Sequence, residues 1–204
     1  MRAMTLLAVA CAALIAGGAA FAAPEAQPRV TLIGDSIAAS LDYVPSARKY
    51  LGKGLDFRTD AAVCRRLVAS SCVFQGTQPA TVLDLVRSSG STLGPVVVIS
   101  VGYNDWAAVY NVDKVMLALK TAKVRAVVWV TLRETTSNYA QINSAIRKAA
   151  RRWPTLVVAD WDAYSRGKPW FISDGLHLTP TGAKGLSRML RPIVLAGLSA
   201  SSTS

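Results

Sequence analysis

Histidine is nearly absent from this chain of 204 residues, since His177 is the only one. Histidine is the side chain that titrates unaided near neutral pH, so any serine-type acid–base chemistry here has to use His177. Cysteine is almost as rare, with three residues, of which Cys11 lies in the leader described next. Two remaining cysteines and one histidine are too few for a structural zinc site, which takes four ligands. We expect no bound metal and no cofactor.

The first residues form an N-terminal leader. Met1-Arg2 is a short basic start, Leu6–Ile15 is apolar, and Ala20-Phe21-Ala22 has the small-x-small pattern of a signal-peptidase site. We predict that residues 1–22 are a cleaved signal peptide. The mature protein is then secreted or extracytoplasmic, in the cell wall or periplasm, without stable membrane insertion. An uncleaved anchor would be weakly hydrophobic, and a lipoprotein attached through Cys11 would lack the usual large aliphatic residue before it.

Cleavage removes Cys11 and leaves Cys64 and Cys72. An even pair of cysteines in an exported protein is typical of a disulfide. We therefore predict a bridge between Cys64 and Cys72 that closes a short loop. The alternative, two unpaired thiols, fits a cytosolic protein better than an exported one.

Acidic side chains are also scarce, with 12 Asp and Glu against 23 Lys and Arg and a net charge of +11. A basic surface attracts polyanions, so nucleic acid has to be considered. The basic residues are scattered, however, and the one dense group, Arg147-Lys148 with Arg151-Arg152, lies on a predicted helix as its solvated face. We predict no nucleic-acid partner; an anionic cell-wall polymer or lipid headgroups fit an exported protein better.

Strand-like and helix-like segments alternate along the mature chain. Val96–Val101 is a continuous apolar run, as expected of a strand buried on both faces. The other predicted strands are residues 30–33, 55–59, 126–132 and 156–159. Apolar residues at helical spacing lie between them. Four predicted helices begin at Ser36, Pro79, Val112 and Pro180, and Ser137 is predicted to cap the helix before the last one.

Strands separated by helices predict parallel pairing, and hence an α/β fold: a three-layer α/β/α sandwich with a five-stranded parallel sheet. We place this single domain at residues 29–198 and expect it to be a monomer. A mobile stretch, residues 23–28, precedes it. The polar residues 199–204 follow it as a tail that we expect to be disordered.

Three short polar motifs stand out. Gly34-Asp35-Ser36 and Gly102-Tyr103-Asn104-Asp105 each follow a predicted strand, and Asp174-Gly175-Leu176-His177 precedes the last helix. The carboxyl ends of strands in an open parallel sheet converge on one crevice, where ligands bind. Each motif alone is explained by an ordinary turn or helix cap. Together they predict one site that holds a serine, a histidine and an aspartate.

In these three motifs the chain resembles the SGNH, or GDSL, hydrolases. The resemblance implies a flavodoxin-like three-layer fold and a triad of Ser36, His177 and Asp174. The second motif of that family is usually built around a glycine; its match here is Asp60–Arg66, with Cys64 at the glycine position.

Within that superfamily the chain is most similar to the small extracytoplasmic domains of membrane acyltransferases that O-acetylate peptidoglycan. The similarity lies in Asp60–Arg66, in Thr131-Leu132-Arg133 leading to Asn138, and in Asp160-Trp161.

The resemblance assigns roles that agree with the chemistry of each side chain. Ser36 is the nucleophile, His177 takes its proton, and Asp174 fixes the imidazole tautomer. The oxyanion would be bound by the N–H of Ser36, the side-chain amide of Asn104 and the N–H of Cys64.

The residues around these motifs have supporting roles. We expect Asp35 and Asp105, with Gly102, to hold their loops, the carboxylates by accepting hydrogen bonds from backbone amides. We expect Arg65 and Arg133 to be solvated, with contact to an anionic substrate as the alternative. The aromatic residues near the motifs either stack on a sugar or acyl group or pack in the ordinary way; these are Tyr103, Trp106, Trp170 and Phe171.

These observations predict an exported serine esterase that hydrolyses small acyl esters, acetyl esters above all, on carbohydrate or cell-wall glycan. An O-acyltransferase that passes the same acyl group to a sugar hydroxyl is the first alternative. A non-catalytic wall-binding protein on a hydrolase scaffold is the second. Binding alone does not require Ser36, Asp174, His177 and Asn104 together, which argues against it. No long apolar lid is present, which disfavours a lipase.

Overall fold

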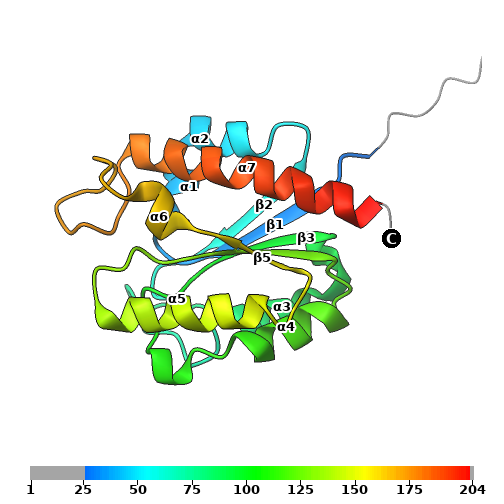
Figure 1. Ribbon diagram of the computed structural model, residues 1–204, viewed down its shortest axis with the longest axis horizontal. Helices are drawn as coiled ribbons and strands as arrows, with labels where there is room; N and C mark the ends of the chain where they lie inside the picture. The colour runs from blue at the N-terminus through cyan, green and yellow to red at the C-terminus, as the bar shows by residue number, and fades with distance from the viewer. Residues whose placement is uncertain (1–25, 203–204) are drawn as a thin grey trace, which may run out of the picture.

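A five-stranded parallel sheet forms the centre of the computed structural model, which describes residues 26–202 (Figure 1). The predicted signal peptide and Cys11 lie outside the described residues. The strands stand in the order β2-β1-β3-β4-β5, which confirms the predicted fold class. Their bounds are β1 (Arg29–Gly34), β2 (Asp56–Ala61), β3 (Val96–Ser100), β4 (Ala126–Val130) and β5 (Leu156–Ala159).

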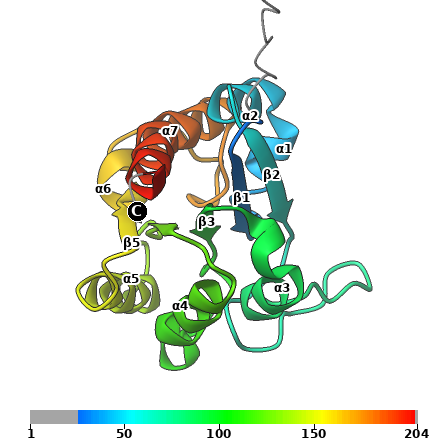
Figure 2. The same cartoon turned by 90° about the vertical axis from the view of Figure 1, so that its right-hand side faces the viewer.

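Helices cover both faces of the sheet (Figures 1 and 2). One layer contains α1 (Ser40–Tyr43), α2 (Pro45–Leu51), α6 (Trp161–Ser165) and α7 (Pro180–Ser202). The other contains α3 (Val82–Ser89), α4 (Val112–Thr121) and α5 (Ser137–Ala150). Two short 3-10 helices, η1 (Gly90–Leu93) and η2 (Ala107–Val109), complete the elements.

Two apolar cores lie on either side of the sheet because successive side chains of a strand point to opposite faces. Leu32 belongs to the core beneath α7, and its neighbour Ile33 belongs to the core over α3 to α5. Val98 and Ile99 of the central strand divide in the same way. Both faces of the central strand β3 are therefore buried, as the sequence predicts.

The register brings the carboxyl ends of three strands level with each other. Gly34 at the end of β1 pairs with Ala61 of β2 on one side and with Ser100 of β3 on the other. The chain at the ends of these strands carries Gly34–Ser36, Asp60–Arg66 and Gly102–Asp105. All therefore leave the sheet at the same edge.

Three helix starts differ from the prediction. Residues 36–39 form a turn, so the first helix begins at Ser40 instead of Ser36. The third helix begins at Val82, well after Pro79, because Thr81 and Asp84 form a capping box. The cap of α5 is Thr136, whose side chain accepts from the Tyr139 amide, so Ser137 is already inside the helix.

The C-terminal helix is longer than predicted. It continues to Ser202, so residues 199–202 are helical and not part of the expected disordered tail. Leu198 packs against the core beneath α7, and the Ser199 hydroxyl donates to the Leu195 carbonyl at 3.2 Å, which extend the helix past the predicted end. The helix α6 was not predicted either. Within residues 26–202 no helix combines the length and the apolar character needed to cross a membrane.

Candidate active site

Ser36, His177 and Asp174 meet at the carboxyl edge of the sheet. Ser36 follows β1 directly, whereas His177 and Asp174 lie in the loop before α7. The Ser36 hydroxyl is 3.0 Å from Nε2 of His177, although 141 positions separate the two residues. Nδ1 of His177 lies 2.6 Å from Oδ2 of Asp174. The structure therefore joins the three predicted residues in one hydrogen-bonded chain.

Asp174 is held as a carboxylate by its own loop. Its Oδ1 accepts from the amides of Leu176 at 2.8 Å and His177 at 2.9 Å. These hydrogen bonds, first that from Leu176, lower the pKa of Asp174 to about 2. An ionised Asp174 accepts from an Nδ1–H group, which leaves Nε2 of His177 free to take a proton from Ser36.

The cluster of Ser36, His177 and Asp174 lies on an open surface. The side chain of His177 is 47% exposed and that of Asp174 is 42% exposed, while Ser36 is half-buried. Water therefore has direct access to the serine and histidine.

A cavity of about 920 Å³ lies at the opposite end of the strands, where β4 and β5 begin, and is lined by Ala126, Thr155 and residues of α7. Within the described residues, no group of three or more metal-ligating side chains gathers in one place.

Asp35 joins the Gly34–Ser36 motif to the Gly102–Asp105 motif. Its buried carboxylate accepts from the amides of Ile37 at 3.0 Å, Gly102 at 3.2 Å and Tyr103 at 3.3 Å. Burial raises the pKa of Asp35 to about 6, against the lowering effect of these amides. Gly102 has a φ of +153°, and a Cβ there would come within 2.9 Å of Leu132, so only glycine fits this contact.

Asp105 joins the Gly102–Asp105 motif to the segment after β2. Both its carboxylate oxygens accept from the Leu67 amide, at 3.1 and 3.2 Å, and the side chain is buried. Burial raises the pKa of Asp105 to about 7. Asn138 at the start of α5 fixes the same loop, donating to the Asp105 carbonyl at 2.9 Å and accepting from the Ala107 amide at 2.9 Å.

Cys64 has the backbone conformation that favours glycine. Its φ is +70°, which agrees with its place at the glycine position of the second motif. The predicted disulfide to Cys72 is confirmed, with a Cα–Cα distance of 5.1 Å, and the Cys72 amide donates to the Cys64 carbonyl at 3.3 Å. Within residues 26–202, the amides of Cys64 and Ser36 donate to no protein acceptor, so both are available to a ligand.

Asn104 is held against the same segment. Its side-chain amide donates to the Arg65 carbonyl at 3.3 Å, and its backbone carbonyl accepts from the Arg66 guanidinium at 2.7 Å. An amide carries two N–H groups, so one remains for a ligand. The structure thus places the third predicted oxyanion donor beside the residue that follows Cys64.

Arg65 is buried, and the expectation of a solvated side chain was wrong. It is only 3% exposed and donates to the carbonyls of Ala80 at 3.1 Å and Gly34 at 3.3 Å. It also pairs with the Asp60 carboxylate at 2.8 Å. Arg65 therefore ties the ends of β1 and β2 to the loop before α3, and it is not placed to meet a substrate.

Arg133 is also not simply solvated. It is half-buried, with its guanidinium 4.2 Å above the Phe171 ring and an N–H group directed at the Gly175 carbonyl. Trp170 stacks on Trp161 with 5.7 Å between ring centroids, so it packs in the ordinary way. Trp106 is 66% exposed beside the Asn104 motif and remains a candidate for contact with a ring.

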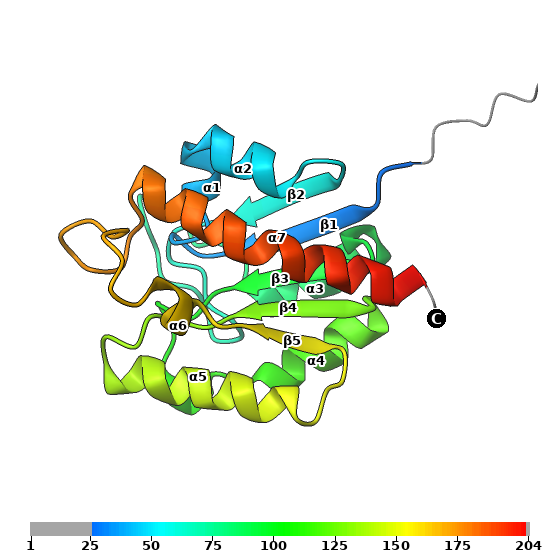
Figure 3. The ribbon, with the colours of Figure 1, turned by 45° about the horizontal axis from the view of Figure 1, so that its top comes forward.

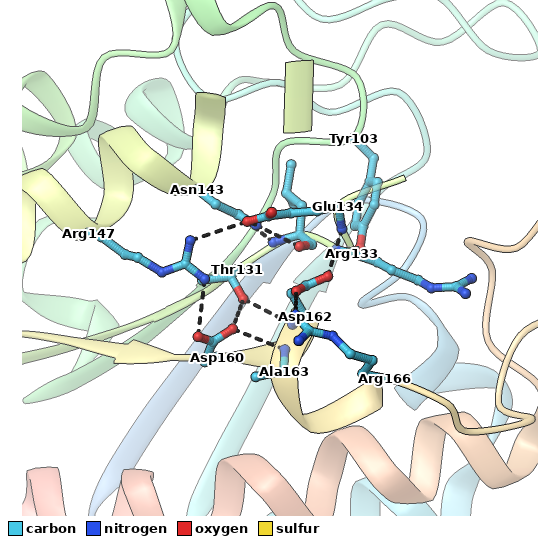
Figure 4. Close-up of polar contacts among 11 residues, drawn as sticks. Tyr103, Thr131, Arg133, Glu134, Asn143, Arg147, Asp160, Asp162, Ala163 and Arg166 are labelled. Carbon is cyan, nitrogen blue, oxygen red and sulfur yellow. Dashed lines mark hydrogen bonds and ion pairs between the residues drawn. The ribbon is translucent and has the colours of Figure 1, made fainter. Parts of the chain in front are cut away.

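Sequence reasoning missed Asn143, a residue of α5 whose side chain contacts Leu132 in the loop after β4 (Figure 4). This fully buried side chain accepts from the Leu132 amide and donates to the Leu132 carbonyl, both at 2.7 Å. It fixes the loop that carries Arg133. The available signal was its position beside Ile142 on the apolar stripe of a predicted helix, where a polar residue needs a partner.

Comparison with known proteins identifies the fold. No family model matches the sequence, and no curated protein does. A carbohydrate acetylesterase family member from Sinorhizobium meliloti matches with a TM-score of 0.61 and 16% identity, covering 84% of this chain and 99% of that one. A protein from Agrobacterium tumefaciens, assigned as an arylesterase, matches with a TM-score of 0.59 and 13% identity, covering 82% and 99%. The chain therefore has the fold of these proteins, as its resemblance to SGNH hydrolases predicts.

Proposed function

We propose that this protein is a serine esterase that hydrolyses small acyl esters, with acetyl groups on carbohydrate or cell-wall glycan as the substrate class. The observation that supports this most directly is the hydrogen-bonded chain from Ser36 through His177 to Asp174. The fold, shared with an acetylesterase family member and a protein assigned as an arylesterase, supports the same reaction class. No step in this reaction needs a metal ion.

In the first half of the reaction, Nε2 of His177 takes the hydroxyl proton of Ser36 while Oγ attacks the ester carbonyl carbon. The carbonyl oxygen becomes an oxyanion and accepts hydrogen bonds from the Ser36 amide, the Cys64 amide and the Asn104 side chain. Loss of one such donor costs about 3–4 kcal/mol of transition-state stabilisation. The imidazolium then protonates the leaving alkoxide, which departs and leaves an acyl group on Ser36.

In the second half, a water molecule replaces the alcohol. His177 takes a proton from this water, whose oxygen attacks the acyl carbon and forms a second oxyanion. The intermediate releases the carboxylic acid, and the proton returns from His177 to Ser36. Asp174 remains a carboxylate throughout and stabilises the imidazolium in both halves.

The exposure of the triad favours hydrolysis over acyl transfer. His177 and Asp174 are nearly half exposed, so water can reach the acyl-enzyme directly. An acyltransferase has to bind its sugar acceptor and keep water away from the same intermediate. The protein acetylated on Ser36 should therefore release acetate in water without an added acceptor.

Export belongs to the same proposal. The sequence begins with signal-peptide features, and the disulfide between Cys64 and Cys72 suits an oxidising compartment outside the cytosol. An exported esterase meets acetylated wall polymers there, and a basic chain is attracted to the anionic ones.

The test is hydrolysis of p-nitrophenyl acetate, butyrate and longer esters, beside acetylated xylan and O-acetylated peptidoglycan. Ser36→Ala should lower kcat/KM by about 10⁴-fold or more and leave the circular dichroism spectrum unchanged. Ser46→Ala, an exposed serine on α2, is the matched control and should keep full activity.

A serine-directed organophosphate provides an independent readout. It should label Ser36 alone, as located by peptide mass spectrometry. Most of the activity surviving in Ser36→Ala would sink the esterase proposal. Acetylated acceptor sugar as the main product, in place of acetate, would favour the acyltransferase.

A further inference from the structure

The loop that carries the histidine is attached to the rest of the molecule by very few polar contacts. We call residues 172–177 the base loop. Most of its hydrogen bonds are internal: the Ile172 amide donates to the His177 carbonyl at 2.9 Å, the Gly175 amide donates to the Ile172 carbonyl at 2.9 Å, and the remaining ones involve Asp174. The loop is therefore well ordered within itself, and its position depends on what it contacts outside.

Within the described part of the chain, two hydrogen bonds leave the base loop. One joins His177 to the Ser36 hydroxyl, and the other runs from Nη1 of Arg133 to the Gly175 carbonyl. In the proposed reaction the first is broken and remade in each turnover. Arg133 thus supplies the polar tether that persists while the serine carries an acyl group.

The Arg133 side chain also holds the residue that precedes the base loop. Its guanidinium lies 4.2 Å above the centroid of the Phe171 ring, and Phe171 forms an isolated β-bridge with Leu178. A planar guanidinium can stack on a ring and donate hydrogen bonds from its edge at the same time, which a lysine ammonium cannot do. Arg133 therefore contacts both the start and the middle of the segment that ends in His177.

The backbone around Arg133 is itself fixed (Figure 4). The Arg133 amide donates to the Tyr103 hydroxyl at 2.7 Å, and the Glu134 amide donates to the Asp162 carboxylate at 2.8 Å. Asn143 holds both polar groups of the Leu132 peptide. Three consecutive residues are thus clamped by side chains from three other segments, which gives the Arg133 side chain a rigid base.

Nearby carboxylates do not compete for Arg133. Arg147 pairs with Glu134 at 3.2 Å and with Asp160 at 3.1 Å, and Arg166 pairs with Asp162 at 2.6 Å. Figure 4 shows the Arg133 side chain extending away from this cluster. Within residues 26–202 Arg133 forms no ion pair, so its donors are left for the base loop.

We propose that Arg133 is a positioning residue that holds the base loop in the position from which Nε2 of His177 reaches the Ser36 hydroxyl. This inference rests on the proposed esterase function. Gly175 fits the role because its φ is +71° and because a Cβ there would lie 3.2 Å from Nη1 of Arg133. The tether links the base loop through Tyr103 to Asp35, which neighbours the nucleophile.

Removing the tether should slow the chemical step and leave binding of a small neutral ester nearly unchanged. A displacement of about 1 Å in a catalytic group can cost about 100-fold in rate. We expect Arg133→Gln to lower kcat for p-nitrophenyl acetate by about 10- to 100-fold with KM within about twofold. Arg133→Lys should recover part of the loss, because an ammonium still donates to the carbonyl but does not stack flat.

Arg166→Gln is the matched control. It removes an arginine from the same cluster, but Arg166 is paired with Asp162 and its side chain is 75% exposed, so kcat should stay at the wild-type value. Circular dichroism and the unfolding temperature of all three variants show whether the fold is kept. A wild-type kcat in folded Arg133→Gln would overturn the proposal. A rise in KM confined to anionic esters, with kcat unchanged, would also overturn it and assign Arg133 to substrate binding.

A second readout does not depend on activity. Because His177 is the only histidine, the proton on its Nδ1 gives one assignable resonance in the imidazole region of the proton spectrum. In Arg133→Gln this proton should exchange with water on the order of tenfold faster, since the loop opens more often. Unchanged exchange would overturn the tether. If the wild-type protein hydrolysed no ester, the proposed function would fail, whereas faster exchange in the variant would still support the tether.

Discussion

The two sides of the candidate triad are held by different means. The nucleophile side is buried: Asp35, next to Ser36, is inaccessible to solvent and receives three backbone amides from two motifs. The base side is open: Asp174 and His177 are nearly half exposed, and their loop is held by internal hydrogen bonds and by Arg133. One side is positioned by the packed edge of the sheet and the other by a short polar loop.

This difference indicates how stability and activity should separate. Substitutions on the nucleophile side disturb buried hydrogen bonds, so they should change the free energy of unfolding. Substitutions on the base side change groups that water can reach, so they should change activity with little effect on folding. Figure 3 shows the long loop between α6 and α7 projecting beyond the carboxyl ends of the strands.

The sharpest test is the pair Asp174→Asn and Asp35→Asn, which make the same chemical change on the two sides. Asp174→Asn should lower kcat by about 10⁴-fold, because the amide no longer fixes the productive tautomer of His177. Its free energy of unfolding at pH 7 should change by less than about 1 kcal/mol, as usual for an exposed group.

Asp35→Asn should instead lower the free energy of unfolding and change kcat much less than Asp174→Asn does. The new NH₂ group cannot accept from the amides of Gly102 and Tyr103, so the variant should lose about 2 kcal/mol of stability. Urea unfolding and steady-state kinetics on both variants give the comparison. Equal losses of stability in the two variants would contradict the division between the sides.

The disulfide tests the oxyanion part of the nucleophile side. Reduction should lower kcat by at least about tenfold and raise KM less, because the Cys64 amide is expected to contact the oxyanion mainly in the transition state. Loss of the cross-link should also cost about 2–3 kcal/mol of stability. Mass spectrometry after alkylation, with and without prior reduction, verifies the bridge.

Two double variants separate the backbone conformation from the cross-link. Cys64→Gly with Cys72→Ser should keep most of kcat, because glycine adopts the φ of +70° without strain. Cys64→Ala with Cys72→Ser should lose it. Equal kcat values in the two double variants would leave the bridge as a purely structural clip.

The pH dependence should also divide between the sides. Activity needs an unprotonated Nε2 on His177 to accept the Ser36 proton, so kcat/KM should fall at acid pH. Asp174, with its pKa lowered to about 2, stays ionised in mild acid and adds no second acid limb there. A flat profile from about pH 5 to pH 8, with chemistry rate-limiting, would contradict the role of His177.

Stability should change with pH in the opposite direction. Asp35 and Asp105 have pKa values raised to about 6 and about 7, above the ordinary 3.8. Between the ordinary and the raised values the folded state binds more protons than the unfolded state, so stability falls as pH rises. We expect a loss of several kcal/mol between about pH 4 and pH 8. Urea unfolding over that range, with Asp105→Asn as a flatter control, measures it.

Much of the fold could be read from the sequence because its signals are local. Five of the six residues of Val96–Val101 are apolar, as expected of a strand buried on both faces, and the alternation of strands with helical segments favours parallel pairing. The helix starts were less accurate. The capping box of Thr81 and Asp84 starts α3 after Pro79. The packing of Leu198 accompanies the extension of α7 into the polar tail.

The candidate site divides in the same way. Ser36, Asp174, His177, Cys64 and Asn104 could be named in advance, because each belongs to a short motif that resembles one of the SGNH hydrolases. The environment of the arginines could not. The sequence shows Arg65 and Arg133 as charged residues without a partner nearby, and solvation is the ordinary expectation for such a residue.

The sequence by itself determined the layered α/β fold, the disulfide pair and the identity of the groups that meet at the sheet edge. Only the tertiary structure decided that Arg65 is buried and that Arg133 reaches Gly175, 42 positions further along the chain. The physical reason is that periodic apolar residues encode burial locally, whereas the partner of a long charged side chain depends on which distant carbonyls, rings and carboxylates the packed chain leaves within its reach.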